Sequence, residues 1–220
     1  MKKLLITTFI ACIYSFTSYA GVNIGVSGQA GLFVATGNEK HSDATQSATA
    51  GNYKVSDTEM GEVGYASIFV EAMIQDRFMI GMDYVPSALS TDTVESVRKD
   101  KTSSATASSV ENKIQVDFED LTTVYVGLMV TENAYVKAGM VTVDVITNES
   151  LGTGGSYGNT DLDGTAIGVG YNKTMDNGVF YRLEGNYMNF DGTSLTQGDM
   201  TVTLKNLDGV TGKVSIGKAF

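Results

Sequence analysis

The sequence contains almost no cysteine, proline, histidine or tryptophan. Among its 220 residues there is one cysteine, one proline, one histidine and no tryptophan. The cysteine, Cys12, falls in an N-terminal segment that we expect to be removed, so the rest of the chain must fold without a disulfide bond. The sequence has no cluster of histidine and cysteine and no Asp-rich calcium loop. We therefore expect no metal site and no cofactor.

Long apolar runs and positive charge are also scarce. After residue 20, no apolar run reaches the roughly 20 residues of a membrane helix. The chain has 25 acidic against 15 basic residues, which excludes a typical nucleic-acid-binding protein. Mean hydropathy is close to zero. Near-neutral hydropathy without long apolar runs is typical of β-barrel strands, because their apolar and polar faces cancel.

The first twenty residues have the three parts of a secretory signal peptide. Lys2 and Lys3 are followed by an apolar run over 4–16 and by small residues at the cleavage site, Ser18 and Ala20. The run is too short for a membrane anchor. A lipoprotein signal at Cys12 is disfavoured because the residues before it match poorly and the apolar run continues past it. We expect a signal peptide at 1–20 and one domain at 21–220.

The mature chain alternates between apolar and other residues with a period of two, which is typical of β-strands and not of helices. Short turns are expected at 75–77, 131–133 and 176–178, and long loops near 37–58, 87–112, 148–161 and 191–199. Because short and long connections alternate, we predict an all-β, eight-stranded, antiparallel, up-and-down transmembrane β-barrel. The predicted strands are 22–36, 61–74, 78–85, 114–130, 134–147, 163–173, 179–190 and 200–220.

The last strand supports a membrane location. Ile216, Val214 and Val210 share one face with Phe220, and small or polar residues occupy the other. A terminal strand that ends in phenylalanine resembles the assembly signal of bacterial outer-membrane β-barrels. The whole region 21–220 resembles the small eight-stranded outer-membrane barrel proteins, similar to the OmpA transmembrane domain, OmpX and OmpW. A lipocalin-like soluble barrel is the alternative, but it would have its apolar residues inside.

Charged residues on the non-apolar face are the candidate functional residues. We expect a lumen charge network of Glu71, Asp83, Arg182, Glu184 and Lys213, with Asp117, Glu119 and Asp144 also facing inward. An eight-stranded barrel has an interior just wide enough for side chains to fill. The network therefore either closes the lumen through paired charges, or acts as a gate that opens when partners change.

The same alternation predicts which residues of the fourth and fifth strands face outward. In the fourth predicted strand the even-numbered residues from Ile114 to Val130 are expected to face out. In the fifth, Val141, Val143 and Val145 are expected to face out, although Lys137 then shares their side. Tyrosines at strand ends are expected to form girdles at the membrane interfaces, namely Tyr84, Tyr135, Tyr171 and Tyr187.

We expect a structural or surface-interacting protein of the outer membrane and not an enzyme. A lipid-modifying hydrolase would need His41, the only histidine, which lies in a predicted loop. Resemblance to OmpW implies the alternative, a narrow channel for small or apolar solutes. The expected partners are outer-membrane lipid, lipopolysaccharide and the barrel assembly machinery, which would recognise the strand ending at Phe220. The chain is expected to be a monomer, and a partner protein would contact the loops around 38–58 and 88–112.

Overall fold

The computed structural model describes residues 20–41, 53–101, 107–152, 156–197 and 200–220. The predicted signal peptide therefore lies outside the described residues, apart from Ala20. In the described ranges no helix is long and apolar enough to cross a membrane. These ranges form eleven strands: β1 (Ala20–His41), β2 (Tyr53–Ile74), β3 (Phe78–Tyr84), β4 (Leu89–Ser90), β5 (Val94–Lys101), β6 (Ala107–Met129), β7 (Ala134–Leu151), β8 (Thr160–Thr174), β9 (Val179–Phe190), β10 (Thr193–Gln197) and β11 (Met200–Ala219).

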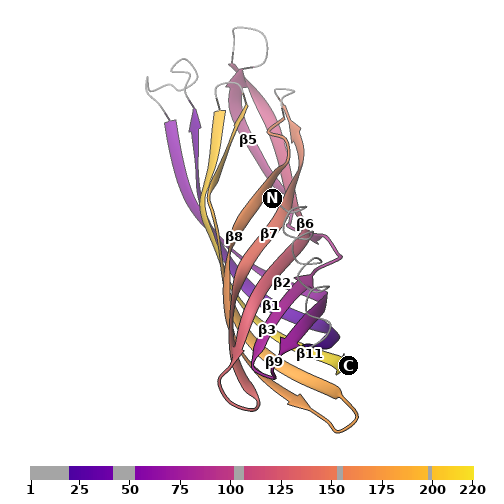
Figure 1. Ribbon diagram of the computed structural model, residues 1–220. Helices are drawn as coiled ribbons and strands as arrows, with labels where there is room; N and C mark the ends of the chain where they lie inside the picture. The colour runs from indigo at the N-terminus through magenta and orange to yellow at the C-terminus, as the bar shows by residue number, and fades with distance from the viewer. Residues whose placement is uncertain (1–19, 42–52, 102–106, 153–155, 198–199) are drawn as a thin grey trace.

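The strands form a closed antiparallel ring (Figure 1). The order around the ring is β1-β2-β3-β6-β7-β8-β9-β11, and β11 returns to pair with β1 from Asn23↔Ala219 to His41↔Met200. β4 and β5 continue the line of β3 along β6, and β10 continues the line of β9 along β11. The described strands thus occupy eight positions in the ring. The predicted number of ring positions, their order and their antiparallel pairing are confirmed.

The strands are longer than the sequence pattern predicts. β1 and β2 stay in register up to His41↔Tyr53, so strand replaces much of the predicted loop at 37–58. β4, β5 and the start of β6 occupy most of the loop predicted at 87–112. β10 replaces part of the loop predicted at 191–199 and pairs with the start of β11. The sequences of these extensions are rich in Ser, Thr, Asn, Asp, Glu and Lys, so they lack the regular apolar alternation that marks a half-buried strand.

The outside of the lower ring is apolar. Val126 is 59% exposed, and apolar side chains on other strands of the ring are also largely exposed. These form an apolar band that includes Ile24, Val26, Ile68, Ile167, Val169, Leu183, Val210, Val214 and Ile216. Ser27, Gln29, Asn186 and Thr211 are buried inside the ring. Polar residues inside and apolar residues outside are the opposite of a soluble barrel and the arrangement of a transmembrane one.

The upper interior, toward the end with the long extensions, is apolar instead of polar. A packed core there is centred on Val85, Leu121, Val141, Val143 and Phe190. Tyr65, Leu162, Ala166, Met188 and Leu207 complete it. The barrel interior therefore has two layers, a polar layer within the apolar band and a hydrophobic layer above it.

This second layer corrects the predicted orientation of β7. Val141 and Val143 are 1% and 2% exposed and Val145 packs against the same core, so all three face inward, not outward. The side-chain alternation along β7 is regular from Tyr135 to Val145, which places Lys137 inside as well. The sequence pattern was misleading because the inward face changes from polar to apolar partway along the strand.

A β-bulge corrects the predicted orientation of β6. The pairing with β7 shifts between Glu119↔Asp144 and Thr122↔Thr142, and Asp120 has a positive φ of 55°. The bulge reverses the side-chain alternation, so Phe118 packs against the interior core although it shares even numbering with the outward Val126. The charges that alternate with Phe118 and Val145, namely Asp117, Glu119 and Asp144, therefore face outward above the band.

Cysteine labelling tests the corrected orientation of β7. Because residues 21–220 contain no cysteine, Met140→Cys and Val141→Cys in a chain of these residues each supply a single thiol. We expect a membrane-soluble maleimide to label the cysteine at position 140, where the native side chain is 48% exposed. The cysteine at position 141 should remain unlabelled in the folded protein and react after denaturation. Equal labelling of both folded variants would contradict the inward assignment of Val141.

Candidate functional site

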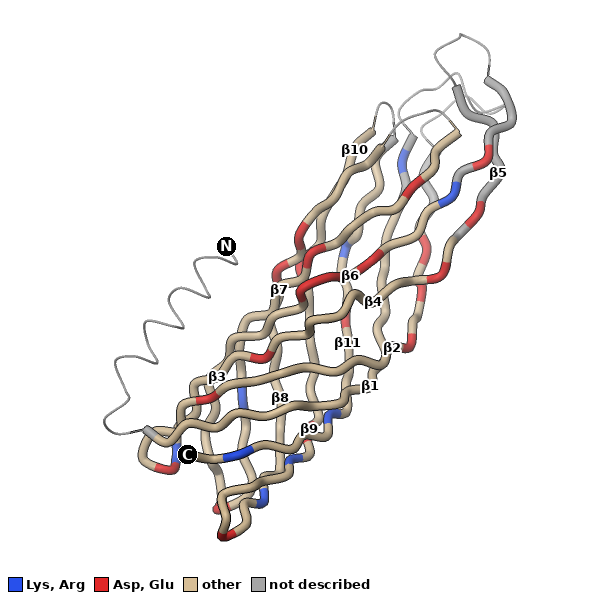
Figure 2. The backbone as a smooth tube through the Cα atoms, turned by 90° about the vertical axis from the view of Figure 1, so that its right-hand side faces the viewer, with Lys and Arg blue, Asp and Glu red and all other residues tan. Residues whose placement is uncertain are grey.

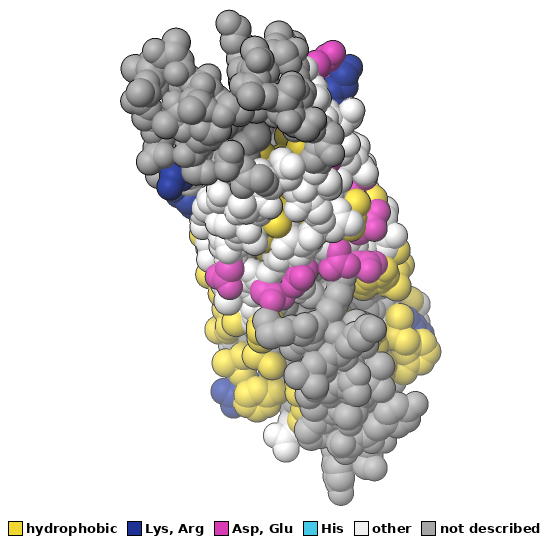
Figure 3. All heavy atoms as spheres, turned by 90° about the horizontal axis from the view of Figure 1, so that it is seen from above, with side chains coloured by type: hydrophobic (Ala, Val, Ile, Leu, Met, Phe, Trp, Pro, Cys, Tyr) yellow, Lys and Arg dark blue, Asp and Glu magenta, His cyan; other side chains and the backbone are white. Residues whose placement is uncertain are grey.

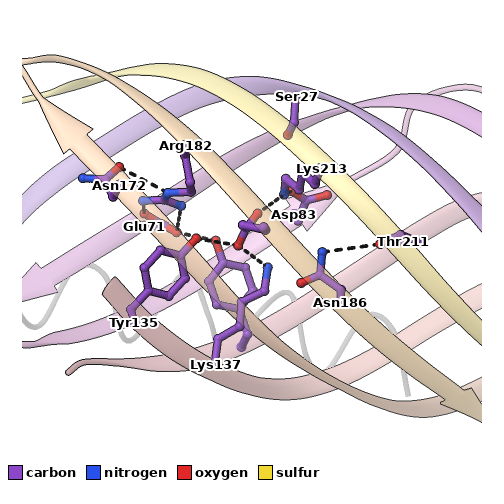
Figure 4. A network of polar contacts seen from close by, with 12 residues as sticks. Ser27, Glu71, Asp83, Tyr135, Lys137, Asn172, Arg182, Asn186, Thr211 and Lys213 are labelled. Atoms are coloured by element: carbon purple, nitrogen blue, oxygen red, sulfur yellow. Dashed lines mark hydrogen bonds and ion pairs between the residues drawn. The ribbon is translucent and has the colours of Figure 1, made fainter. Parts of the chain in front are cut away.

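Charged side chains from five strands converge inside the lower ring (Figure 4). They comprise Glu71 on β2, Asp83 on β3, Lys137 on β7, Arg182 and Glu184 on β9, and Lys213 on β11. All five residues predicted for the lumen charge network belong to this group. The set, which we call the charge layer, contains three acidic and three basic groups and so has no net charge.

Glu71 and Arg182 form the first half of the charge layer. Their exposed fractions are 0% and 2%. The two guanidinium nitrogens Nη1 and Nη2 of Arg182 donate to Oε1 and Oε2 of Glu71 at 2.6 and 2.8 Å, a bidentate pair. Tyr125 donates its hydroxyl to Oε1 of the same carboxylate at 2.6 Å. Because the pair satisfies most of its hydrogen-bonding groups internally, its burial is tolerated.

Three further residues continue the layer from Glu184. Lys137 Nζ lies 2.6 Å from Glu184 Oε1, and Lys213 Nζ lies 3.3 Å from Glu184 Oε2. Lys213 also contacts Asp83 in an ion pair. Tyr135 donates its hydroxyl to Glu184 at 2.6 Å. Each lysine therefore meets at least one carboxylate, and the lysines and carboxylates together span the lumen.

Aromatic rings fill the space between these charges. The guanidinium of Arg182 lies 5.2 Å from the ring centres of Phe69, Tyr135 and Phe180. Contacts at this distance favour a buried cation over an aromatic face. The rings of Tyr125 and Tyr135 are accommodated by glycine, because a Cβ at Gly81 or Gly170 would overlap them. These glycines allow each tyrosine to lie along the wall while its hydroxyl reaches a carboxylate.

Sequence reasoning missed three members of this site. Lys137 was predicted to share the outer face, Tyr135 was predicted to belong to an interfacial girdle, and Tyr125 was given no role. Tyr135 is only 2% exposed, so its girdle assignment is wrong. The available signal was the shared odd numbering of Tyr135 and Lys137, which places both on one face of β7.

The members of the charge layer are paired with one another. Every member of the layer has an oppositely charged partner from another strand. Within the described residues, no group of three or more histidine, cysteine or acidic residues is arranged to hold a metal ion. The layer lies below the apolar core, so paired charges and then packed hydrophobic side chains occupy the lumen in sequence.

Acidic residues also mark the upper boundary of the apolar band. Figure 2 shows Asp and Glu at similar heights on several neighbouring strands, and Figure 3 shows an arc of acidic side chains beside the hydrophobic zone. Tyr84 and Tyr187 each donate a 2.6 Å hydrogen bond, to Asp120 and Asp208 respectively. Together with Asn189 and Asn206, the hydroxyl of Tyr187 holds the pKa of Asp208 below its ordinary value. The upper boundary of the apolar band is therefore marked by carboxylates that accept hydrogen bonds from tyrosine.

The backbone pairing shows where Phe220 and His41 lie, the two remaining residues singled out from the sequence. Phe220 is 75% exposed, and its N–H and C=O exchange hydrogen bonds of 2.9 and 3.2 Å with Val22. The terminal residue therefore takes part in closing the ring between β11 and β1. His41 is the last residue of β1, in register with Tyr53 and Met200, so it lies at a strand end and not within a loop.

The ring, its inverted polarity and the short turns at one end define the fold. It is that of a small outer-membrane β-barrel. No protein-family model and no curated protein matches the sequence.

Among solved structures, the chain is similar to the outer membrane protein OprG from Pseudomonas aeruginosa, with 14% identity over 92% of this chain and 96% of that chain and a TM-score of 0.48. It is similar to the outer membrane protease OmpT from Escherichia coli, with 8% identity over 91% and 97% and a TM-score of 0.43. Ail, the attachment invasion locus protein of Yersinia pestis, matches with 10% identity over 89% and 99% and a TM-score of 0.35. The fold assignment itself rests on the strand register that closes the ring.

Proposed function

We propose that this chain is an integral outer-membrane protein that acts through the strand extensions above the membrane and does not conduct solutes. The observation that carries this proposal is the filled interior. The charge layer is neutral and internally paired, and the apolar core above it is packed around side chains as little exposed as Val85 and Val141. A path for water or ions would have to break both layers, and burying an unpaired charge costs several kcal/mol.

The extensions provide the surface for interaction. β1 and β2 continue in register to His41↔Tyr53, far beyond the apolar residues at their lower ends. β5 and β6 form a second projecting hairpin, in which Lys113 pairs with Glu95 at 2.7 Å. Strands hold their residues in fixed positions at little entropic cost on binding, which suits a recognition surface better than flexible loops.

The proposal includes the environment of the protein. The chain would be exported through the signal at 1–20 and reside in the outer membrane as a monomer. Lipid, including lipopolysaccharide, would surround the apolar band. The barrel assembly machinery would recognise the last strand, β11, with Phe220. We propose no catalytic role.

A second candidate is a narrow channel for small apolar solutes. It is favoured by the apolar upper interior and by a gap in the ring. β2 pairs with β3 from Ile68 to Ile74, and among the described strands its upper part pairs only with β1. An apolar molecule could enter from above and meet the charge layer as a floor. This candidate requires the upper core to rearrange, whereas the first requires no change.

Single-channel recording separates the two candidates. The refolded chain in a planar bilayer should show no discrete openings in salt solution. Arg182→Ala and Lys213→Ala each remove a cation from the charge layer but leave the apolar core above it packed, so both variants should also show no discrete openings. Stable wild-type openings would overturn the proposal. Saturable uptake of an apolar dye into proteoliposomes, with silent ion recordings, would favour the second candidate.

A further inference from the structure

Above Ile68, the ring of hydrogen bonds is interrupted on one side of β2. Its partner β3 ends at Tyr84, and the strands that follow, β4 and β5, pair with β6. In the part of the chain that the structure describes, no strand pairs with the upper part of β2 on the side away from β1. Figure 1 shows the strands above this point as two separate groups, with β1 and β2 in one and β5 to β7 in the other.

The backbone groups on this open edge can be assigned by alternation. Val22 directs both its N–H and its C=O to Phe220 on β11, so its register partner Ala72 directs its own groups away from β1. The carbonyl of Ile74 also points away from β1, because it accepts a hydrogen bond from the amide of Arg77 in the turn to β3. The β1–β2 register has no shift, so the even-numbered residues Met60, Glu62 and Gly64 direct their backbone groups toward the open edge.

The upper part of β7 also has an edge without a strand partner among the described residues, and there other residues of the chain cover it. The upper part of β7 is paired with β6 on one side only, and the segment before β8 lies along the other. The amide of Thr147 donates to the side chain of Asn159 at 3.0 Å, and the amide of Tyr157 donates to the carboxylate of Glu149. On β2 the corresponding contact is local, from the amide of Thr58 to Asp57 at 2.8 Å. The amides beyond it toward Ile68 have no such cover among the described residues.

The charges beside the open edge select the partner. Residues 56–66 contain Asp57, Glu59 and Glu62 and no lysine or arginine. All three acidic residues are exposed, as is Met60 at 69%. A second copy pairing edge to edge would place like charges close together, which is destabilising. A strand carrying lysine or arginine would gain both backbone hydrogen bonds and favourable charge pairs.

We propose that the β2 edge from Thr58 to Ala66 binds an extended, positively charged segment of a partner protein by adding it to the sheet as a further strand. This inference rests on the proposed function, since it names the partner class for the extensions. The backbone of Met60, Glu62 and Gly64 supplies the hydrogen bonds. The carboxylates of Glu59 and Glu62 supply the preference for basic side chains, one on each face of the strand.

The test uses the refolded full-length mature chain in zwitterionic micelles and a fluorescent ten-residue peptide of alternating lysine and threonine. In the control peptide every backbone nitrogen is methylated, which keeps every lysine charge and removes the backbone N–H donors. We expect the unmodified peptide to bind at least tenfold more tightly than the methylated one. Met60→Pro removes an edge donor and should weaken binding at least tenfold, while Met60→Ala should bind as the wild type does. Glu62→Gln should weaken binding severalfold.

Several outcomes overturn the inference. The inference is wrong if the unmodified peptide does not bind, or if both peptides bind equally tightly. It is also wrong if the unmodified peptide binds Met60→Pro as tightly as the wild type while that variant migrates as a folded barrel. Self-association of the chain that Met60→Pro abolishes would assign the edge to a second copy instead. These failures leave a non-conducting surface protein intact, whereas single-channel openings would overturn the proposed function without deciding the peptide result.

Discussion

Replacing Arg182 by methionine is expected to destabilise the refolded barrel by about 3–5 kcal/mol, the cost of leaving one partner of a buried ion pair alone. Glu71 is fully buried, and without the guanidinium the hydrogen bonds left to its carboxylate among the described residues are those from the Tyr125 hydroxyl and, at 3.4 Å, from Asn23. The free energy of unfolding in urea, followed by circular dichroism in lipid vesicles, measures the effect.

The matched control removes both charges. The double variant Glu71→Leu, Arg182→Met should recover most of the lost stability, because replacing a buried pair by apolar groups of similar volume is often neutral or stabilising. A single Arg182→Met variant as stable as the wild type would show that Glu71 is hydrated, and the account of a filled lumen would then be wrong.

Val126→Arg is expected to cost about 2–4 kcal/mol, the penalty for a cation on the lipid face near the middle of the membrane. Val126 is largely exposed within the apolar band, between Ile80 on β3 and Ala138 on β7 in the register. The same urea titration in lipid vesicles measures it.

Val202→Arg is the corresponding control. Val202 is also exposed, but it lies on β11 opposite Glu39 and Leu195, in the extensions above the acidic boundary. Its replacement should change the stability by less than about 0.5 kcal/mol, as is usual for exposed positions. Similar costs at both sites would contradict the location of the apolar band.

The sequence was sufficient for the ring and for most of the charge layer. In β1, β9 and β11 one face is apolar and the other polar within the band, so simple alternation placed Arg182, Glu184 and Lys213 inside. The same alternation placed Glu71 and Asp83 correctly. The turn signals, such as Asn177-Gly178, fixed where the chain reverses, and Gly178 has the positive φ of 80° that such a turn requires.

The errors have three physical causes. First, the interior changes from polar to apolar above the charge layer, so Val141 suggested the wrong face of β7 and Lys137 was misplaced with it. Second, the bulge at Asp120 reverses the alternation in β6, and a backbone irregularity leaves no periodic signal. Third, the strand extensions above the band lack regular apolar alternation, so a segment such as Thr193–Gln197 has the composition of a loop and the structure of a strand.

Residue-resolved amide hydrogen exchange along β2 tests most directly the claim that the barrel is closed within the band and divided above it. We predict slow exchange for the even-numbered amides from Ile68 to Ala72, which face β3, and fast exchange at Met60, Glu62 and Gly64. The odd-numbered amides Gly61, Val63 and Tyr65 face β1 and should exchange slowly, which provides a control within the same strand. If Met60, Glu62 and Gly64 exchange as slowly as Val70 and Ala72, the edge is closed in solution and the account of an open upper ring is wrong.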